Sequence, residues 1–473
     1  MKKQTFGLIV TNRSFFPAHL VSEAKSMVLA KLHAMGYEAV SVTEQDTRYG
    51  AVASYREAKI CAELFQQHRS EISGILVILP NFGEETAVAD AISLAGLNVP
   101  VLVQACDDEM NNLGLENRRD AFCGKISVCN NLHQRGIPFT LTSTHTCKIG
   151  SESFTRDIER FAGVCRVVNG MRGARIAAIG CRPNAFNTVR CSEKILQKNG
   201  ITVCTEDMAN IIAAAKGMDD DAERVRKKLE EIRSYGTIPS GIAPEKVLRQ
   251  AKLCLALEDC VERYDCVASA MECWDAVQNS YGCATCLSMS MMGEQGRPSA
   301  CEMDVMGAVT MYAMRLASQT APAYMDWNNN VDDDRDCCIT LHCSNFPKSF
   351  FRKESIEISN LDVLSTTIGA EKCFGACKAQ VAGGPMTFGK ITTDDENGVM
   401  KMYVGRGEFL DNPVRTKGGV ALCRVKGLQK MLRYICRSGY EHHVAMCRGD
   451  VADILREAFS TYFGMEVYTH NAE

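Results

Sequence analysis

The 473-residue chain has no long hydrophobic run and no strong excess of either charge. Its apolar stretches stay short of the 18 or more residues that a membrane-spanning helix needs. Lysine and arginine total 53 against 57 aspartate and glutamate residues, which gives a formal net charge of −4. A chain without a basic field is a poor match for nucleic acid or an anionic membrane surface. We therefore expect no nucleic acid and no membrane among its partners.

Nucleotide-binding motifs and a secretion signal are also missing. The glycine-containing segment 180–187 follows a predicted strand, but it matches neither GxGxxG nor a P-loop. The apolar run at the N-terminus, Phe6–Val10, is too short for the core of a signal peptide. We therefore expect no redox cofactor and a cytoplasmic location.

Cysteine, by contrast, is abundant, with 24 residues. They are scattered along a long chain, and many lie inside apolar runs, which favours reduced core thiols over a disulfide framework. The CxxC of Cys283 and Cys286 and the CxxxC of Cys373 and Cys377 have no second pair at zinc-finger spacing. The cysteines therefore predict buried free thiols and neither a zinc finger nor a thioredoxin-like site.

The length and the hydrophobic pattern predict several domains. Residues 1–170 alternate helical segments with continuous apolar runs, such as GILVIL, that are typical of parallel strands. The pattern restarts near Arg172, so residues 171–345 form a second such unit. Residues 346–473 change to short strands with turn signals. We predict two doubly wound, Rossmann-like α/β domains and a C-terminal β-rich, barrel-like domain, with the site between the second and third.

Acidic residues beside apolar runs mark candidate chemistry. Glu302 and Asp304 stand where an apolar helix is predicted to begin. A carboxylate at Asp304 fits an ordinary helix start, whereas Glu302 precedes the helix and can point into a cleft. Asp326 is predicted at the carboxyl end of a strand, which is a common ligand position.

Histidine is scarce, with nine residues, and His342, His442 and His443 flank predicted strands late in the chain. Each could be an ordinary hydrogen-bonding side chain. Two carboxylates with an imidazole, however, form a mixed oxygen and nitrogen shell that suits manganese, magnesium or cobalt, whereas a structural zinc site favours thiolates. The residues alone leave open which histidine would bind.

Motifs spread over nearly the whole chain resemble those of the L-fucose and L-arabinose isomerase family, and more closely its fucose-isomerase-like branch. The motifs are NRSFFP, FGEETAVADA, CWDAVQNSYGC, PSACEMDVMGAVTM, AYMDWN, LHCSN and HHVAMCRGDVADIL. The resemblance implies an aldose–ketose isomerase whose metal ligands are Glu302, Asp326 and a histidine of the late pair, for which we expect His443 rather than His442. It implies Mn²⁺, with Mg²⁺ or Co²⁺ as alternatives, and a trimeric or hexameric homo-oligomer.

The chemistry of these residue types agrees with that activity. Moving a proton between C1 and C2 of a sugar needs a base and an acid, for which Glu302 and Asp326 are the candidates. A divalent ion bound by both sugar oxygens stabilises the enediolate.

Four further residues are candidates for contact with the sugar. Trp274 and Gln278 stand four residues apart, so one helical face could offer an indole and an amide, although a core tryptophan fits equally well. Arg13 resembles the family's arginine that reaches a neighbouring subunit's site, and by itself it could be a solvated loop residue. His342 is a candidate polar group of the pocket.

The chain is shorter than a true fucose isomerase and differs in its sugar-contacting loops, so the sugar stays open. It could be fucose-like, arabinose-like, deoxy or sulfonated, with sulfoquinovose as the specific alternative. Arg13, Arg182 and Arg297 are cations that could bind a sulfonate. Two other functions compete with isomerisation. A non-catalytic sugar-binding protein would need no metal, and a metal-dependent lyase or aldolase would yield two fragments.

Overall fold

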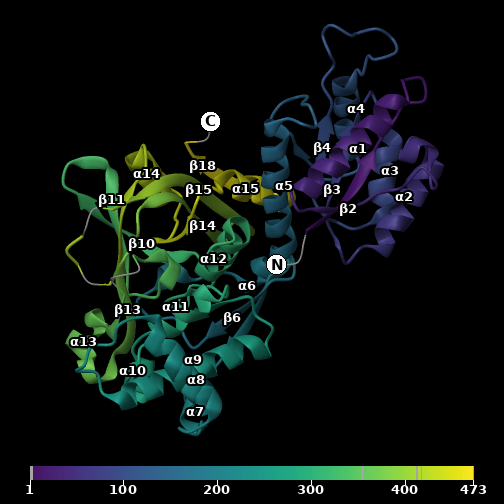
Figure 1. Ribbon diagram of the computed structural model, residues 1–473. Helices are drawn as coiled ribbons and strands as arrows, with labels where there is room; N and C mark the ends of the chain where they lie inside the picture. The colour runs from purple at the N-terminus through teal and green to yellow at the C-terminus, as the bar shows by residue number, and fades with distance from the viewer. Residues whose placement is uncertain (1–3, 353–355, 412–413, 417, 472–473) are drawn as a thin grey trace. The chain divides into compact units, whose positions relative to one another are not determined.

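The computed structural model describes residues 4–352, 356–411, 414–416 and 418–471 (Figure 1). The chain divides into two compact units. The first comprises residues 1–169 and 457–464, and the second comprises residues 170–456 and 465–473. The finer division into three domains, with boundaries at 170 and 345, stays a prediction.

The first unit is built on a five-stranded parallel sheet of order β2-β1-β3-β4-β5. Successive residues of a strand face opposite sides of the sheet. Leu76 and Ile78 therefore join the core with α1 and α5, while Ile75 and Val77 join the core with α2, α3 and α4. Helices cover both faces, which confirms the predicted doubly wound fold. The elements are β1 Thr5–Val10, α1 His19–Ala34, β2 Glu38–Val40, α2 Tyr55–Gln67, β3 Ile72–Leu79, α3 Glu85–Ala95, β4 Val101–Ala105, α4 Ala121–Gln134, β5 Thr140–Leu141 and α5 Glu152–Met171.

The second unit begins with a smaller parallel sheet of order β7-β6-β8-β9. It confirms the α/β pattern predicted to restart near Arg172. The carboxyl ends of β6, β8 and β9 lead directly into Gly180, Glu272 and Cys301. The elements are β6 Arg175–Ile179, α6 Glu193–Lys198, β7 Thr202–Glu206, α7 Met208–Gly217, α8 Glu223–Tyr235, α9 Pro244–Arg263, β8 Ala268–Met271, α10 Ala276–Ser280, α11 Cys286–Glu294, β9 Ser299–Ala300 and α12 Val305–Ser318.

The rest of this unit is a nine-stranded sheet of order β12-β13-β16-β11-β10-β17-β14-β15-β18. An additional pairing of β15 with β16 closes six of these strands into a ring. The prediction of a β-rich, barrel-like C-terminal part is therefore confirmed. The elements are β10 Ala323–Val331, β11 Asp334–His342, β12 Glu357–Asn360, α13 Asp362–Ile368, β13 Phe374–Gln380, β14 Gly384–Asp394, β15 Val399–Leu410, β16 Gly419–Arg424, α14 Leu428–Arg437, β17 His443–Arg448, α15 Ala452–Glu457 and β18 Glu466–His470.

Helix α12 joins the parallel sheet to the barrel, because it packs against β8 on one side and against β14 and β17 on the other. Close packing is possible since residue 307 is glycine. A Cβ atom there would come within 2.2 Å of the Tyr324 hydroxyl. The segment just before α12 is thereby held between the two sheets.

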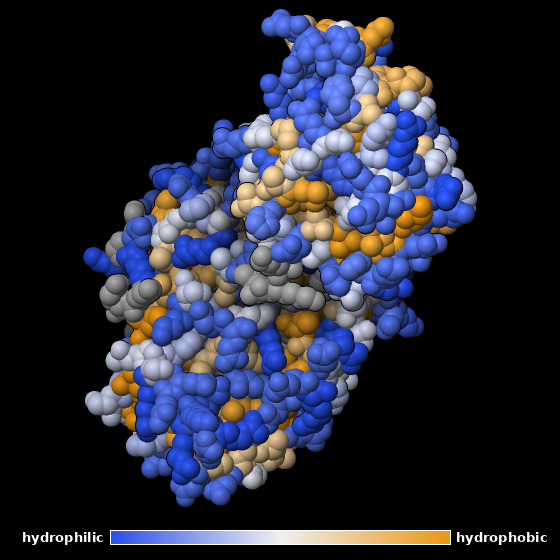
Figure 2. Space-filling model, turned by 45° about the vertical axis from the view of Figure 1, so that its right-hand side comes forward, coloured by the Kyte–Doolittle hydropathy of each residue, from blue (hydrophilic) through white to orange (hydrophobic). Residues whose placement is uncertain are grey.

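The cysteines and the surface agree with the composition. All 24 cysteines lie in the described part of the chain as free thiols, and eighteen of them are buried, including Cys283, Cys286, Cys373 and Cys377. The face shown in Figure 2 is mainly hydrophilic, with apolar residues in scattered groups. Across the described ranges, no helix combines the length and the apolar character that crossing a bilayer requires.

Candidate active site

Two carboxylates and a histidine from three separate segments meet in the second unit. Glu302 follows β9, Asp326 lies within β10, and His443 begins β17. In the antiparallel pairing of β10 with β17, Asp326 stands directly opposite His443. Directly opposite residues share a face of the sheet. The Nε2 atom of His443 lies 2.9 Å from Oε2 of Glu302 and 3.6 Å from Oδ1 of Asp326.

The strand position predicted for Asp326 is wrong. Asp326 lies in the middle of β10, which continues to Val331, and the chain turns at Asp332, where φ is 43°. The three asparagines after Trp327 read as a turn because asparagine is rare in strands. Pairing with β11 holds them extended, with Asn329 opposite Ile339 and Asn330 opposite Cys338.

Glu302 is buried, and its backbone is strained. Glu302 and Met303 have φ values of 59° and 60°, in the left-handed region that non-glycine residues rarely adopt. Such conformations cost about 1–3 kcal/mol each and are found mainly where function requires them. The Glu302 Oε1 atom accepts a hydrogen bond from the Trp274 indole at 3.3 Å. The prediction that Glu302 precedes the helix is confirmed.

Asp304 caps α12, as expected of a carboxylate at a helix start, because the backbone N–H of Gly307 donates to its Oδ1 at 2.7 Å. Its Oδ2 atom also lies 3.0 Å from Nδ1 of His443 and accepts from the Tyr324 hydroxyl and the Lys390 ammonium. Burial opposes ionisation of Asp304, but the charge of Lys390 and the contact with His443 hold its pKa well below the usual range. Asp304 therefore supports His443 as well as the helix.

His443 is oriented by this carboxylate. An ionised carboxylate only accepts hydrogen bonds, so Nδ1 of His443 carries a proton toward Asp304 and Nε2 is turned toward Glu302 and Asp326. Burial disfavours a charged imidazole. The hydrogen bonds with Asp304 and Glu302, together with the charge of Asp304, nevertheless raise the pKa of His443 to about 9. Burial alone would raise the pKa of Glu302, but the hydrogen bond from His443, the charges of His342 and His443 and the hydrogen bond from Trp274 together lower it.

His342 and His442 lie at the edge of the same cluster. The Nδ1 atom of His342 accepts from the backbone N–H of Cys343 at 2.8 Å, so the neutral ring carries its proton on Nε2. That Nε2 atom lies 3.9 Å from Oδ1 of Asp326, as does Nε2 of His442. The His442 side chain is 43% exposed. Burial and the neighbouring His443 lower the pKa of His442. His342 is thus arranged to donate to an oxygen, and His442 borders solvent.

The donor set fits a divalent metal ion. Oδ1 of Asp326 is buried and has no hydrogen-bond partner among the residues that the structure describes. Buried polar atoms normally have partners, so an orphaned carboxylate oxygen facing imidazoles marks a place where a cation would complete the site. Ligand atoms of Glu302, His342 and His443 lie within 4.8 Å of one another, and so do those of Asp326, His442 and His443.

Two other candidates for sugar contact belong to the same unit. The expected helical face of Trp274 and Gln278 is wrong, because α10 begins only at Ala276. The Trp274 indole still reaches the site, where its ring meets Phe186 at 5.2 Å. Gln278 is fully buried, and its amide donates to the carbonyl of Cys273 at 2.8 Å.

The arginines are placed differently. Arg13 belongs to the first unit, where its guanidinium contacts the Gly83 carbonyl at 2.8 Å and the carboxylate of Glu85. Arg182 lies in the loop after β6, the loop whose Phe186 ring packs near His442 at 5.8 Å. Arg297 precedes β9 and faces Glu262 at 3.7 Å. It therefore stands at the amino end of the strand that Glu302 follows.

Lys390 and Tyr324 are site residues that the sequence reasoning missed. Both are fully buried and contact Asp304. Tyr324 comes two residues before Asp326 on β10, so the period of a strand would have placed both on one face. Lys390 is the one charged residue in the segment PMTFGKIT, and a lysine is almost never buried without a partner. That pattern was the available signal.

A groove of about 420 Å³ also opens in this unit, between β10, β11 and α14. It meets the cluster only at His442 and is otherwise lined by residues such as Trp327, Leu432 and Tyr440. The carboxylates and His443 do not line it. The cluster, and not the groove, defines the candidate site.

Comparison with known proteins agrees with this geometry. The family model described as Fucose/sulfoquinovose isomerase, N-terminal domain, matches residues 7–172, and the one described as L-fucose isomerase, C-terminal domain, matches residues 340–470. A sulfoquinovose isomerase of Alkalicoccus urumqiensis is 25% identical over 305 residues, which cover 63% of this chain and 66% of that protein. A sulfoquinovose isomerase of Priestia aryabhattai is 22% identical over 366 residues, which cover 76% and 77%.

Among solved structures, an ABC transporter solute-binding protein from Burkholderia multivorans aligns at 9% identity, covering 68% of this chain and 95% of that one. Its TM-score of 0.18 is too low to support an argument. The family matches indicate the class of this protein, a sugar aldose–ketose isomerase. The chain belongs to the fucose/sulfoquinovose isomerase family, which confirms the resemblance found in the sequence.

Proposed function

We propose that this protein is a divalent-metal-dependent isomerase that interconverts an aldose and a ketose, with sulfoquinovose as its sugar. The observation that supports the metal is the buried, unpartnered Oδ1 of Asp326, which faces the imidazole of His443 at 3.6 Å. The sugar is supported by the matched relatives, which are sulfoquinovose isomerases at 22–25% identity. The proposal includes a cytoplasmic homo-oligomer in which Arg13 serves a neighbouring subunit.

Glu302, Asp326 and His443 would hold the ion, which we expect to be Mn²⁺, with Mg²⁺ or Co²⁺ as alternatives. Oxygen and imidazole donors suit these ions. When bound, the ion supplies a Lewis acid that polarises the carbonyl and hydroxyl oxygens of the sugar. His443 is preferred over His442 because Asp304 fixes its Nδ1–H and leaves Nε2 to bind.

The two carboxylates would move the proton between C1 and C2. Each has a second oxygen that can exchange a proton with the sugar while the first serves the ion. The Asp326 side chain is 24% exposed and the Glu302 side chain 7%, so Asp326 is the more open to an entering sugar. The Nε2–H of His342 would donate to a sugar oxygen, and the Trp274 indole would border the ring.

A sulfonate would need a cation, and Arg182 is the candidate within this unit. It shares the loop after β6 with Phe186, which packs on Trp274 and His442. Its guanidinium donates to the carbonyl oxygens of Pro183 at 2.9 Å and Asn184 at 3.4 Å, and no carboxylate among the residues that the structure describes forms an ion pair with it. Arg297 is a weaker candidate because it faces Glu262 at the amino end of β9.

A panel of aldoses tests this proposal. The purified enzyme with Mn²⁺ is offered sulfoquinovose, L-fucose, L-arabinose and glucose, and the products are identified by mass and by NMR. We expect a ketose of unchanged mass and the highest kcat/KM with sulfoquinovose. Two fragments would indicate a lyase or aldolase, and binding without turnover would indicate a sugar-binding protein. Arg182→Gln should raise KM for sulfoquinovose and leave KM for any neutral sugar that turns over unchanged.

A further inference from the structure

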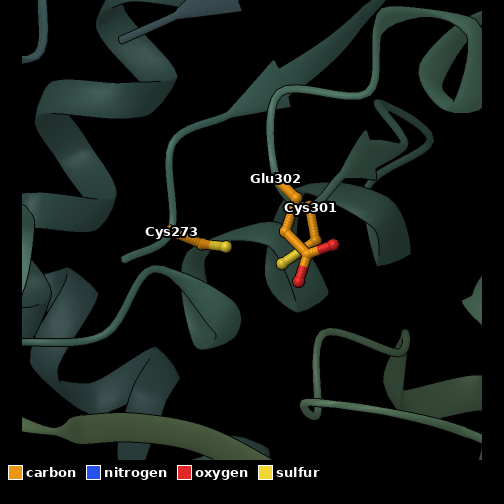
Figure 3. Close-up of side chains that lie close together, drawn as sticks. All are labelled: Cys273, Cys301 and Glu302. Carbon is orange, nitrogen blue, oxygen red and sulfur yellow. The ribbon is translucent and has the colours of Figure 1, made fainter. Parts of the chain in front are cut away.

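Two thiols lie beside Glu302 and have no role in the proposed reaction. Cys273 follows β8 and Cys301 follows β9, and these strands are parallel neighbours in which Ala270 pairs with Ala300. Both cysteines therefore emerge at the same edge of the sheet. Figure 3 shows the Cys273 thiol pointing toward Cys301 and the Glu302 carboxylate. The two sulfurs and a carboxylate oxygen lie within 4.8 Å of one another.

The spacing of these three atoms suits a metal ion. Zinc binds thiolate sulfur at about 2.3 Å, so two sulfurs around one tetrahedral ion are about 3.8 Å apart. Since the three ligand atoms already lie within 4.8 Å of one another, side-chain shifts of at most about 1 Å would bring the sulfurs to this separation. Cys273 and Cys301 are 2% and 0% exposed, so few water molecules would compete for the ligands.

The chemical type of the donors selects a different ion from that of the histidine cluster. Thiolates prefer thiophilic ions such as Zn²⁺, whereas carboxylate oxygen with imidazole accommodates Mn²⁺. The two donor sets therefore lie side by side, because Glu302, which follows β9, belongs to both. A metal ion bound at Glu302 would therefore be adjacent to both thiols.

We propose that Cys273, Cys301 and Glu302 form a second metal site that binds a thiophilic divalent ion of the Zn²⁺ or Cd²⁺ type. Each thiol releases one proton to solvent as its sulfur binds the ion, so two protons leave for each ion bound. Occupation of this site draws Glu302 away from the histidine cluster. The withdrawal of Glu302 rests on the proposed function. Because Glu302 is shared, thiophilic ions would compete with Mn²⁺ for this carboxylate.

Cadmium titration of the reduced, metal-free protein tests the site directly. Cd²⁺ bound to thiolates gives an ultraviolet charge-transfer band that Mn²⁺ does not give. We expect the band to saturate at one ion per chain, and X-ray absorption to find two sulfur neighbours. The variant Cys273→Ser/Cys301→Ser should lose the band. The matched control is Cys204→Ser/Cys266→Ser, which should keep the band. It removes two buried thiols that lie next to each other, Cys204 in β7 and Cys266 just before β8.

Competition with Mn²⁺, measured by EPR of free Mn²⁺, tests the shared carboxylate. In a titration, Cd²⁺ should release bound Mn²⁺ from the native chain at lower Cd²⁺ concentrations than from Cys273→Ser/Cys301→Ser. Equal release from both would overturn the sharing of Glu302. A charge-transfer band that survives the loss of both cysteines would overturn the site itself. A thiolate band in a chain that binds no Mn²⁺ would support this second metal site and contradict the proposed function. Mn²⁺-dependent activity without the band would contradict the second metal site and support the proposed function.

Discussion

The imidazole of His443 and the carboxylate of Asp304 share a fully buried contact, with Nδ1 and Oδ2 3.0 Å apart and both side chains 0% exposed. Because Asp304 is also fixed by Gly307, Tyr324 and Lys390, the ring has one orientation, with Nε2 toward Glu302. A carboxylate behind a metal-binding histidine sets both the tautomer and the direction of the ring. The surrounding residues thus hold the His443 ring in the orientation that metal binding through Nε2 requires.

Replacement of Asp304 by asparagine should weaken metal binding and the fold together. We expect the affinity for Mn²⁺ to fall about 10- to 100-fold, because the support of His443 is altered. The free energy of unfolding should fall by about 3–5 kcal/mol, since Lys390 would be left buried without its counter-charge. Calorimetric titration and urea unfolding measure the two effects.

Asp207→Asn is the matched control, because Asp207 caps α7 in the same way but is exposed at the surface. It should cost about 1 kcal/mol or less and leave Mn²⁺ binding unchanged. Equal, small effects of the two substitutions would show that Asp304 only caps its helix, which is the role that the sequence alone indicated.

Asp304 illustrates what the sequence could and could not predict about the site. Its position before an apolar helix identified the cap, because capping depends on residues a few positions away. Its contacts with Tyr324, Lys390 and His443 depend on the pairing of strands far apart in the chain. No local pattern encodes that register, so the supporting network was missed while Glu302 and the histidine pair were found through the family motifs.

The two adjacent histidines should differ sharply on substitution. His443→Gln removes a buried imidazole that faces Glu302 and Asp326, so the chain should lose stoichiometric Mn²⁺ binding. His442→Gln changes a side chain that is 43% exposed and should keep one bound ion per chain. Metal analysis after gel filtration distinguishes them. Retention of metal by His443→Gln and its loss from His442→Gln would reverse the assignment.

The metal-free protein should lose stability as the pH rises from about 6.5 to about 9. The pKa of His443 is raised to about 9 by Asp304 and Glu302 against the effect of burial. A raised pKa stabilises the folded state below the ordinary value of 6.5 and ceases to do so above about 9. Urea unfolding across this range measures the decline, which His443→Gln should abolish.

Binding of Mn²⁺ should show the opposite trend over the same range. The ion must displace a proton from Nε2 of His443, so its affinity should increase up to about pH 9 and then level off. An affinity for Mn²⁺ that is independent of pH in this window would argue that His443 is not a ligand.

Amide substitutions separate proton transfer from folding. Glu302→Gln and Asp326→Asn keep the shape of each side chain but remove its charge and basicity. We expect kcat to fall by at least about 10²-fold in each, the low end of what a positioned acid or base contributes. Deuterium from solvent should enter the product of the native enzyme at C1 or C2. Near-native rates in both variants would place the reaction elsewhere.

Much of the fold followed from the hydrophobic pattern, because continuous apolar runs such as β3 and strand pairs such as β14 and β15 carry their own signals. The errors lie where tertiary contacts override local preference. The sequence predicts a strand end at Asp326 because the asparagines after it favour turns, yet pairing with β11 extends them. The spacing of Trp274 and Gln278 predicts a helix at Trp274, but α10 begins two residues later.

The most direct test of the proposed metal dependence is the rate of isomerisation before and after removal of the metal. The purified enzyme is treated with a chelator, the chelator is removed, and the conversion of sulfoquinovose to its ketose is followed by NMR with and without added Mn²⁺. We expect the rate to fall to the background of the uncatalysed reaction and Mn²⁺ to restore it. Full activity in protein shown to be free of metal would contradict it.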